Sequence, residues 1–465
     1  MREVDWAGPL DEARRCAGAY LAGLPDRPPA ARAGLAELRA ALGGPLPATP
    51  TDPREVVAEL ARAAEPGLVG SGGGRYFGFV VGGATPAALA ADWLTAGWDQ
   101  NAGLYVLSPA AAVVEEVAGG WLAELLGLPA GGSVGFVTGG QAANTTALAA
   151  ARHEVLRRAG WDVEAAGLAG APRVRVLAGV ERHGTVDRAV RLLGLGTDAV
   201  QPVEADAQGR MRPDALAARL AAGDGPAIVC AQVGNVNTGA VDPVGEICRI
   251  AARTGAWVHV DGAFGLWAAA SPRLRPRVAG VELADSWATD AHKWLNVPYD
   301  SGLVFCADPA AHRAALGARA SYLVHAAGGE RDPFDFNPES SRRARGFPVY
   351  AALRALGRSG VADLVDRCCA LARRFADRLA DGPGVDVLNE VVLNQVLVRF
   401  GDDDARTREV VRRVQADGTC WLGGTTWQGR AAMRVSVSSW ATDESDVDRS
   451  VAAVLRCAEA VAAGR

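Results

Sequence analysis

The chain of 465 residues is 49% hydrophobic and 22% charged, and its formal net charge is −5. This length predicts a globular protein of roughly two or three domains. The slightly negative charge gives no electrostatic reason to expect a nucleic acid or an anionic membrane as a partner. The sequence shows no signal peptide and no apolar run long enough to span a membrane, and its eight cysteines lack metal-binding spacing. We therefore expect a cytoplasmic protein without a metal site.

The N-terminal segment, residues 1–66, is predicted to consist of helices separated by prolines. A helix-capping position before Pro53 and the proline itself in the first turn favour a helix start there. The glycine-rich stretch that follows, 67–78, lacks the GK[ST] ending of a phosphate-binding P-loop, so we interpret it as a flexible connector. The three predicted helices are 10–24, 31–42 and 53–64.

Between residues 130 and 310, short apolar runs alternate with longer helical stretches such as 141–160 and 243–256. Continuous apolar runs that alternate with helices are typical of a mostly parallel sheet with helices on both faces. In such an α/β fold, ligands bind beyond the carboxyl ends of the strands. The apolar runs are 133–140, 173–181, 227–235, 257–265 and 301–308.

The pattern changes again near residue 351, where the chain becomes helical and then gives two strand-like runs, 391–400 and 431–440. This order indicates a smaller α+β domain. We therefore predict an N-terminal helical segment over 1–66, a large α/β domain over 67–350 and a small C-terminal domain over 351–465.

Lys293 is the only lysine among 48 lysine and arginine residues. Arginine stays protonated, whereas a partly desolvated lysine amine can lose its proton and form a Schiff base with a carbonyl group. A lysine retained by chance on a solvated face is the alternative. The apolar neighbours Ala291, Trp294, Leu295 and Val297 argue against that alternative.

Three further features follow the predicted strands. Gly139 and Gly140 would open a helix whose free N–H groups suit a phosphate, although a tight turn explains them equally well. Asp261 ends an apolar strand, where an acid needs a cation or a hydrogen-bond donor such as a pyridinium nitrogen. His183 follows another strand, and a purely structural histidine is the alternative reading. With Lys293, these are the parts that pyridoxal 5′-phosphate (PLP) requires.

The motifs DAHKWLN (290–296) and HVDGAFG (259–265) make the sequence similar to the group II PLP-dependent amino acid decarboxylases. The resemblance extends from RYFGF (75–79) to VSVSSW (435–440). It implies the PLP-dependent transferase fold type I. It also implies a homodimer with the active site at the interface and the N-terminal helices wrapped around the partner. Members of this family act on aromatic amino acids, glutamate or cysteine sulfinate.

The resemblance also implies roles for single residues. Lys293 would form the Schiff base, and Asp261 would keep the ring nitrogen of the cofactor protonated. His183 would stack on one face of the ring, with Ala263 on the other. The remaining implied contacts, to the phosphate or the substrate, are Gly139, Gly140, Gln141, Asp290 and His292.

The segment ASYLVH (320–325) resembles the mobile catalytic loop of the family. Tyr322 matches the tyrosine that returns a proton to the substrate carbon after carbon dioxide leaves. Relatives that make aldehydes by oxidation usually carry phenylalanine at this position. Tyrosine therefore favours simple decarboxylation to an amine.

Two departures from the family pattern leave other reactions open. Ala142 stands where a glutamate is usual, and Asn235 and Val236 stand where two threonines are usual. An aminotransferase, a carbon–carbon lyase or an aldehyde-forming decarboxylase is therefore the alternative reading, and a regulatory protein without turnover is a further one. The product formed would distinguish them.

Few features of the sequence indicate which amino acid is the substrate. Gln100 and Asn101 precede the SPA motif, in a segment that lines the partner subunit's pocket in aromatic-specific relatives. Polar groups there would suit a polar or acidic substrate, and an ordinary capped loop is the alternative. Phe79 in the RYFGF motif and Arg434, which could meet a substrate carboxylate, complete the candidates.

Overall fold

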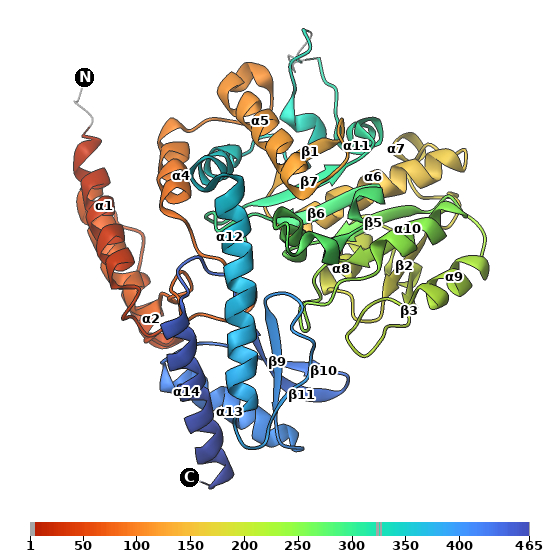
Figure 1. The fold of residues 1–465 in the computed structure, drawn as a ribbon. Helices are drawn as coiled ribbons and strands as arrows, with labels where there is room; N and C mark the ends of the chain where they lie inside the picture. The colour runs from red at the N-terminus through yellow and green to blue at the C-terminus, as the bar shows by residue number, and fades with distance from the viewer. Residues whose placement is uncertain (1–4, 322–324, 326–327, 465) are drawn as a thin grey trace.

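The computed structural model of the protein describes residues 5–321, 325 and 328–464. Along the chain, an arm of N-terminal helices is followed by a large α/β domain and a small α+β domain (Figure 1). This is the fold class expected from the sequence. The long helix α12 (Gly346–Ala380) passes from the large to the small domain and bends at Gly357, which has a φ of 63°. The expected boundary at residue 350 therefore falls inside a helix.

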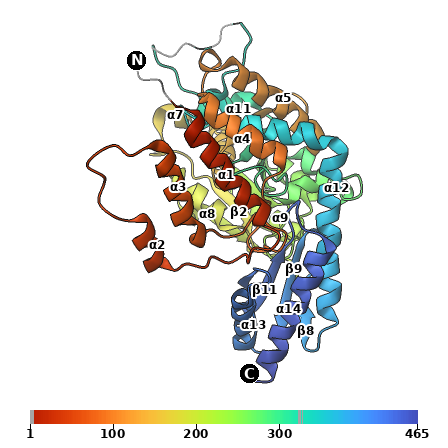
Figure 2. The ribbon, with the colours of Figure 1, turned by 90° about the vertical axis from the view of Figure 1, so that its left-hand side faces the viewer.

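The arm contains the three expected helices, which stand beside the rest of the chain (Figure 2). Asp52 caps the third of them, as its Oδ1 accepts hydrogen bonds from the backbone N–H groups of Arg54 and Glu55. These helices are α1 (Ala7–Gly23), α2 (Leu35–Leu42) and α3 (Pro53–Ala64).

The large domain is built on a seven-stranded sheet with the order β1-β7-β6-β5-β4-β2-β3. Neighbouring strands from β6 to β3 are parallel, and β7 is antiparallel to both of its neighbours, so the sheet is mostly parallel as expected. The strands are β1 (Ser133–Val137), β2 (Arg175–Gly179), β3 (Val200–Val203), β4 (Ala227–Gln232), β5 (Trp257–Asp261), β6 (Ser286–Asp290) and β7 (Gly302–Cys306).

Helices cover both faces of this sheet (Figure 1). Helices α6, α8 and α11 pack on one face, and α5, α9, α10 and α12 pack on the other, while α4 lies against α12. Their bounds, with those of the short α7, are α4 (Pro86–Trp98), α5 (Pro109–Leu126), α6 (Gly140–Arg158), α7 (Val163–Ala166), α8 (Gly184–Leu192), α9 (Pro213–Ala221), α10 (Val244–Ala252) and α11 (Pro309–Leu316).

The small domain carries a four-stranded antiparallel sheet in the order β10-β11-β9-β8. Both expected strand runs contain a strand, although the second strand ends at Ser436 rather than continuing to residue 440. The elements are β8 (Val385–Val387), β9 (Gln395–Phe400), α13 (Asp404–Asp417), β10 (Gly423–Trp427), β11 (Arg430–Ser436) and α14 (Glu444–Ala462).

The glycine-rich stretch before the large domain is more than the flexible connector expected. The N–H of Phe77 donates to the carbonyl oxygen of Trp421 at 2.7 Å, and the N–H of Ser436 donates to the carbonyl oxygen of Phe77 at 3.0 Å. The stretch is therefore tied to the small domain by backbone hydrogen bonds, which sequence patterns do not reveal because any residue can make them.

Candidate active site

The predicted site residues gather at one edge of the large sheet. Strands β4, β5 and β6 are parallel, and β1 runs in the same direction because two antiparallel pairings separate it from β6. The carboxyl ends of these strands therefore meet at the same edge, where α/β proteins bind ligands. Gly139, Asp261 and Lys293 lie at or just beyond those ends.

Lys293 follows β6 and has 22% of its side chain exposed. Its Nζ lies 3.0 Å from Oδ2 of Asp290, a carboxylate with only 2% of its side chain exposed. Trp294 and Leu295 beside it are fully buried. Lys293 is therefore a partly desolvated amine held by a buried carboxylate, as its apolar neighbours predict.

His292 stands next to this pair. Its Nδ1 accepts a hydrogen bond from the backbone N–H of Ser301 at 3.2 Å, and its Nε2 lies 3.7 Å from Oδ1 of Asp290. The ring packs against Tyr299, with 4.5 Å between ring centroids. Burial lowers the pKa of His292, and the Asp290 carboxylate partly opposes that shift.

The glycine turn before α6 packs closely against the same two side chains. A Cβ at Gly140 would lie 2.8 Å from Oδ2 of Asp290, and one at Gly139 would lie 3.2 Å from Cε1 of His292. Any larger residue would crowd this space. Gln141 follows in the first turn, where its Nε2 donates to the Thr185 carbonyl at 3.3 Å.

Asp261 is the last residue of β5 and is buried. Its Oδ2 accepts a hydrogen bond from Nδ2 of Asn144 at 3.1 Å, and its Oδ1 accepts one from the N–H of Ala263 at 3.3 Å. His183 is exposed and lies at the N-terminus of α8, where its Nδ1 is 3.0 Å from Oγ1 of Thr185. Asn144 and Thr185 were not anticipated as site residues.

Asn235 and Val236, two of the three positions that depart from the family pattern, have distinct surroundings. Asn235 uses its whole amide: Nδ2 donates to Glu181 O and Gln232 Oε1, and Oδ1 accepts from two backbone N–H groups of the following turn. Val236 offers its carbonyl oxygen to Nη1 of Arg434 at 2.9 Å. Asn235 therefore shapes the turn after β4, and its amide has no donor left for a ligand.

Arg434 lies on β11 of the small domain and reaches the turn after β4 through that hydrogen bond. Burial lowers the pKa of its guanidinium group. The contact brings a cation of the small domain to the loop that follows one of the site strands.

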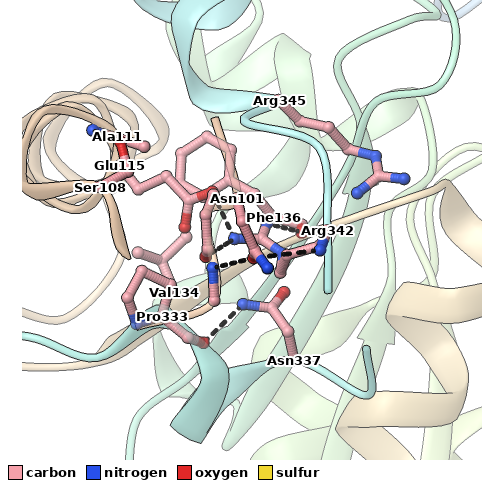
Figure 3. Close-up of polar contacts among 12 residues, drawn as sticks. Asn101, Ser108, Ala111, Glu115, Val134, Phe136, Pro333, Asn337, Arg342 and Arg345 are labelled. Carbon is pink, nitrogen blue, oxygen red and sulfur yellow. Dashed lines mark hydrogen bonds and ion pairs between the residues drawn. The ribbon is translucent and has the colours of Figure 1, made fainter. Parts of the chain in front are cut away.

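The polar candidates before the SPA motif are engaged in hydrogen bonds to the backbone. Oδ1 of Asn101 accepts hydrogen bonds from the N–H groups of Gly103 at 3.0 Å and Arg342 at 3.4 Å (Figure 3). Nε2 of Gln100 donates to the carbonyl oxygen of Trp98. These contacts are those of a capped loop, so they weaken the argument for a polar or acidic substrate.

Phe79 is 63% exposed and has a φ of 54°, which is unusual for a bulky residue. Its ring stacks on Trp421, and Trp421 stacks in turn on Tyr76. Tyr322 lies outside the described residues, so its position stays a prediction.

Comparisons with known proteins point in one direction. The family model of the pyridoxal-dependent decarboxylase conserved domain matches residues 37–400. Tryptophan decarboxylase 1 from Oryza sativa subsp. japonica is 31% identical over 446 residues, which cover 88% of this chain and 84% of that protein. L-2,4-diaminobutyrate decarboxylase from Rhizobium meliloti (strain 1021) is 33% identical over 320 residues, covering 67% of this chain and 62% of that protein.

Two further likenesses concern the fold and the range of reactions. The crystal structure of Oryza sativa TDC with PLP and tryptamine matches with a TM-score of 0.92 and 26% identity, covering 99% of both chains. 4-Hydroxyphenylacetaldehyde synthase from Rhodiola rosea is 27% identical over 416 residues, which cover 84% of this chain and 82% of that protein.

The geometry around Lys293 suits PLP. Oδ1 of Asp290 is buried and has no hydrogen-bond partner among the described residues, so it is left to accept a hydrogen bond from a further group. Asp261 offers an anionic acceptor for a ring nitrogen, and Lys293 offers an amine for the aldehyde. The donor set is therefore the one that the cofactor needs.

Proposed function

Because the chain belongs to the group II PLP-dependent amino acid decarboxylases, it is a carboxy-lyase with PLP as its cofactor, and we propose that it converts one L-amino acid into its amine and carbon dioxide. The observation that carries the proposal is the meeting of Lys293, Asp261 and the Gly139–Gly140 turn at one edge of the sheet. Each supplies a different part of the cofactor's binding site.

In the proposed mechanism, Lys293 would hold the cofactor through its side-chain amine. The bound cofactor supplies an electron sink for the bond that releases carbon dioxide. Asp261 would accept a hydrogen bond from the protonated ring nitrogen, and its contact to Asn144 keeps the carboxylate oriented. His183 would cover one face of the ring and Ala263 the other.

The residues around the Lys293 amine are proposed to bind the charged groups of the substrate and to transfer the proton. The carboxylate of Asp290 lies 3.0 Å from Nζ of Lys293 and holds the lysine beside the glycine turn. Arg434 can meet the substrate carboxylate from the small domain. Tyr322 then delivers the proton to the substrate carbon.

We also propose a homodimer, which exposed apolar side chains on the arm and on α4 support. Large apolar side chains on α1, α3 and α4 are at least partly exposed, and exposed apolar surface of this kind marks interfaces. They include Leu10, Leu21, Val56, Leu60, Trp93, Leu94 and Trp98. A second copy of the chain would cover them and complete the site.

The proposed location is the cytoplasm. All eight cysteines lie in the described part of the chain and are free, and seven of them are buried. Unpaired thiols agree with a reducing compartment. Within the described residues, none of the helices combines the length and apolarity needed to cross a bilayer.

A panel of L-amino acids tests the proposal. The purified, PLP-loaded protein is incubated with each amino acid, and products are identified by mass spectrometry. One amine from one amino acid is expected. A keto acid as the main product would contradict the proposal and indicate an aminotransferase.

An aldehyde-forming reaction is the second candidate, because an aldehyde synthase is among the relatives. Tyrosine at position 322 speaks against it. An aldehyde with ammonia as the main product in the same panel would establish that reaction instead.

A further inference from the structure

A row of buried polar side chains runs from the interior of the sheet to Asp261. Trp257, Ser286, His259 and Asn144 are each at most 1% exposed. Nε1 of Trp257 donates to Oγ of Ser286 at 2.9 Å, and that Oγ lies 3.0 Å from Nδ1 of His259. Nε2 of His259 lies 2.9 Å from Oδ1 of Asn144. Nδ2 of Asn144 then donates to Oδ2 of Asp261 at 3.1 Å.

The two ends of this row dictate the direction of every hydrogen bond in it. The carboxylate of Asp261 can only accept, so Asn144 must turn its NH₂ group toward it and its oxygen toward His259. Nε2 of His259 must therefore carry the proton, which leaves Nδ1 as an acceptor for the hydroxyl of Ser286.

The other end is compatible with this direction. The indole N–H of Trp257 donates to the oxygen of Ser286, which leaves the hydroxyl proton of Ser286 free to point to Nδ1 of His259. Burial also lowers the pKa of His259 to about 4, which favours the neutral ring that this direction requires. His259 is thus held in a single tautomer.

The row branches at Asn144. Besides donating to Asp261, Nδ2 of Asn144 donates to Oγ1 of Thr185 at 3.0 Å. The Thr185 oxygen lies 3.0 Å from Nδ1 of His183, which also accepts from the backbone N–H of Thr185. Nδ1 of His183 is therefore an acceptor, and the proton of a neutral His183 ring resides on Nε2, facing away from Thr185.

We propose that His259 and Asn144 are positioning residues that set the orientation of the Asp261 carboxylate and the direction of the hydrogen bond to Thr185. The inference rests on the proposed function, which places Asp261 at the ring nitrogen of PLP and His183 over the ring. The relay acts at a distance: His259 contacts neither the ring nitrogen nor the ring face, and it works through the amide of Asn144. Without it, the amide can turn over, and an oxygen then faces the carboxylate.

Replacement of His259 tests the relay. His259→Leu removes both hydrogen bonds, while His259→Gln keeps an N–H that can reach the Asn144 oxygen. His312→Leu is the matched control, because His312 is also fully buried and bonded to a serine but lies outside the relay. PLP affinity of the cofactor-free protein is measured by fluorescence titration, and the ratio of the visible absorption bands of bound PLP is measured at a fixed pH.

We expect His259→Leu to weaken PLP binding about tenfold, because the hydrogen bond from Asn144 to the charged Asp261 is lost. The ratio of the visible absorption bands should also change. His259→Gln should restore both, and His312→Leu should change neither. Native affinity and a native spectrum in His259→Leu would overturn the proposal, and so would equal changes in His312→Leu. If His259→Leu fails to fold, Ser286→Ala should show a smaller change in the same direction, and no change there would overturn the proposal.

A double replacement separates this inference from the proposed function. If the relay acts through Asp261, His259→Leu adds nothing to the loss of PLP affinity in Asp261→Asn. Full additivity of the two losses would overturn the relay while leaving the cofactor site intact. A wild-type protein that bound no PLP would instead contradict the proposed function.

Discussion

At the scale of single residues, the positive charge of Lys293 and the reactivity of its amine have separate functions. Its ammonium group pairs with Asp290 at 3.0 Å, and an arginine could satisfy that carboxylate equally well. An arginine could not attack the aldehyde of PLP, because its guanidinium stays protonated. The ion pair therefore explains how the lysine is held, and only its amine explains why a lysine is needed.

Lys293→Arg should abolish the visible absorption of bound PLP and all turnover. The protein should still fold, because the charge opposite Asp290 is kept. Absorption spectroscopy after addition of PLP, with circular dichroism as the folding control, measures both. A normal visible spectrum in this variant would sink the assignment of Lys293.

The sequence alone predicted the residues whose chemistry is distinctive. Lys293 was the only lysine, and Asp261 was an acid at the end of an apolar strand. Asn144 and Thr185 carry no such signal, because amides and hydroxyls are common in helices and turns. Asn144 reaches Asp261 because α6 lies against β5, and Thr185 reaches Asn144 because α8 lies against α6; no local pattern encodes either contact.

At the scale of elements, strand β5 directs alternate side chains to the two faces of the sheet. Val258 and Val260 belong to the core shared with α10, whereas Trp257, His259 and Asp261 point to the other face, where α6 packs. This alternation is the two-residue period of a strand. It places a histidine in an apolar interior, where the neutral form is strongly favoured.

The contribution of His259 to stability should therefore fall with acid, whereas buried Asp242, whose pKa is raised to about 6, contributes with the opposite sign. Burial lowers the pKa of His259 from 6.5 to about 4, so between these values the unfolded chain binds a proton that the folded protein does not. The stabilisation is fully present above pH 6.5 and is lost as the pH falls toward 4, by about 3 kcal/mol. Urea unfolding across this range should show a shallower decline in His259→Gln. An unchanged decline would contradict the assignment, while the buried His312 contributes in the same direction to both proteins.

A buried ion pair fastens α5 to the segment before α12 (Figure 3). Nη1 of Arg342 lies 2.7 Å from Oε1 of Glu115, with both side chains fully buried, and it also donates to the carbonyl oxygen of Ala102. Arg342→Met should lower the free energy of unfolding by about 3 kcal/mol or more, because Glu115 keeps only the more distant Arg331. Glu115→Leu combined with Arg342→Met should recover much of that loss in urea unfolding. An unchanged free energy of unfolding in Arg342→Met would show that the Glu115 carboxylate is not buried in solution.

The elements that sequence patterns missed share one property: none of them is a continuous apolar run. Strand β6 begins with Ser286 and ends with Thr289 and Asp290, yet every residue in it is buried. Ser286 is accommodated there by its hydrogen bonds to Trp257 and His259. Strand β3 contains a proline and β10 is rich in glycine and threonine, so neither resembles an apolar run.

At the scale of the whole molecule, the apolar surface of the arm is the basis of the proposed dimer. Leu10→Glu combined with Leu60→Glu should convert the dimer to a monomer and strongly reduce turnover, because the site is proposed to lie at the interface. Leu283→Glu is the matched control, as Leu283 is a similarly exposed leucine outside the arm. Light scattering after size exclusion gives the mass. A double variant that stayed dimeric would place the interface elsewhere.

The central claim is that this enzyme removes carbon dioxide and returns a proton. The most direct measurement follows carbon dioxide, amine and dissolved oxygen together in one reaction with the amino acid that the panel identifies. We predict equal amounts of carbon dioxide and amine with no oxygen uptake. Carbon dioxide accompanied by aldehyde, ammonia and oxygen consumption would contradict the formation of an amine. Turnover without carbon dioxide would contradict decarboxylation itself.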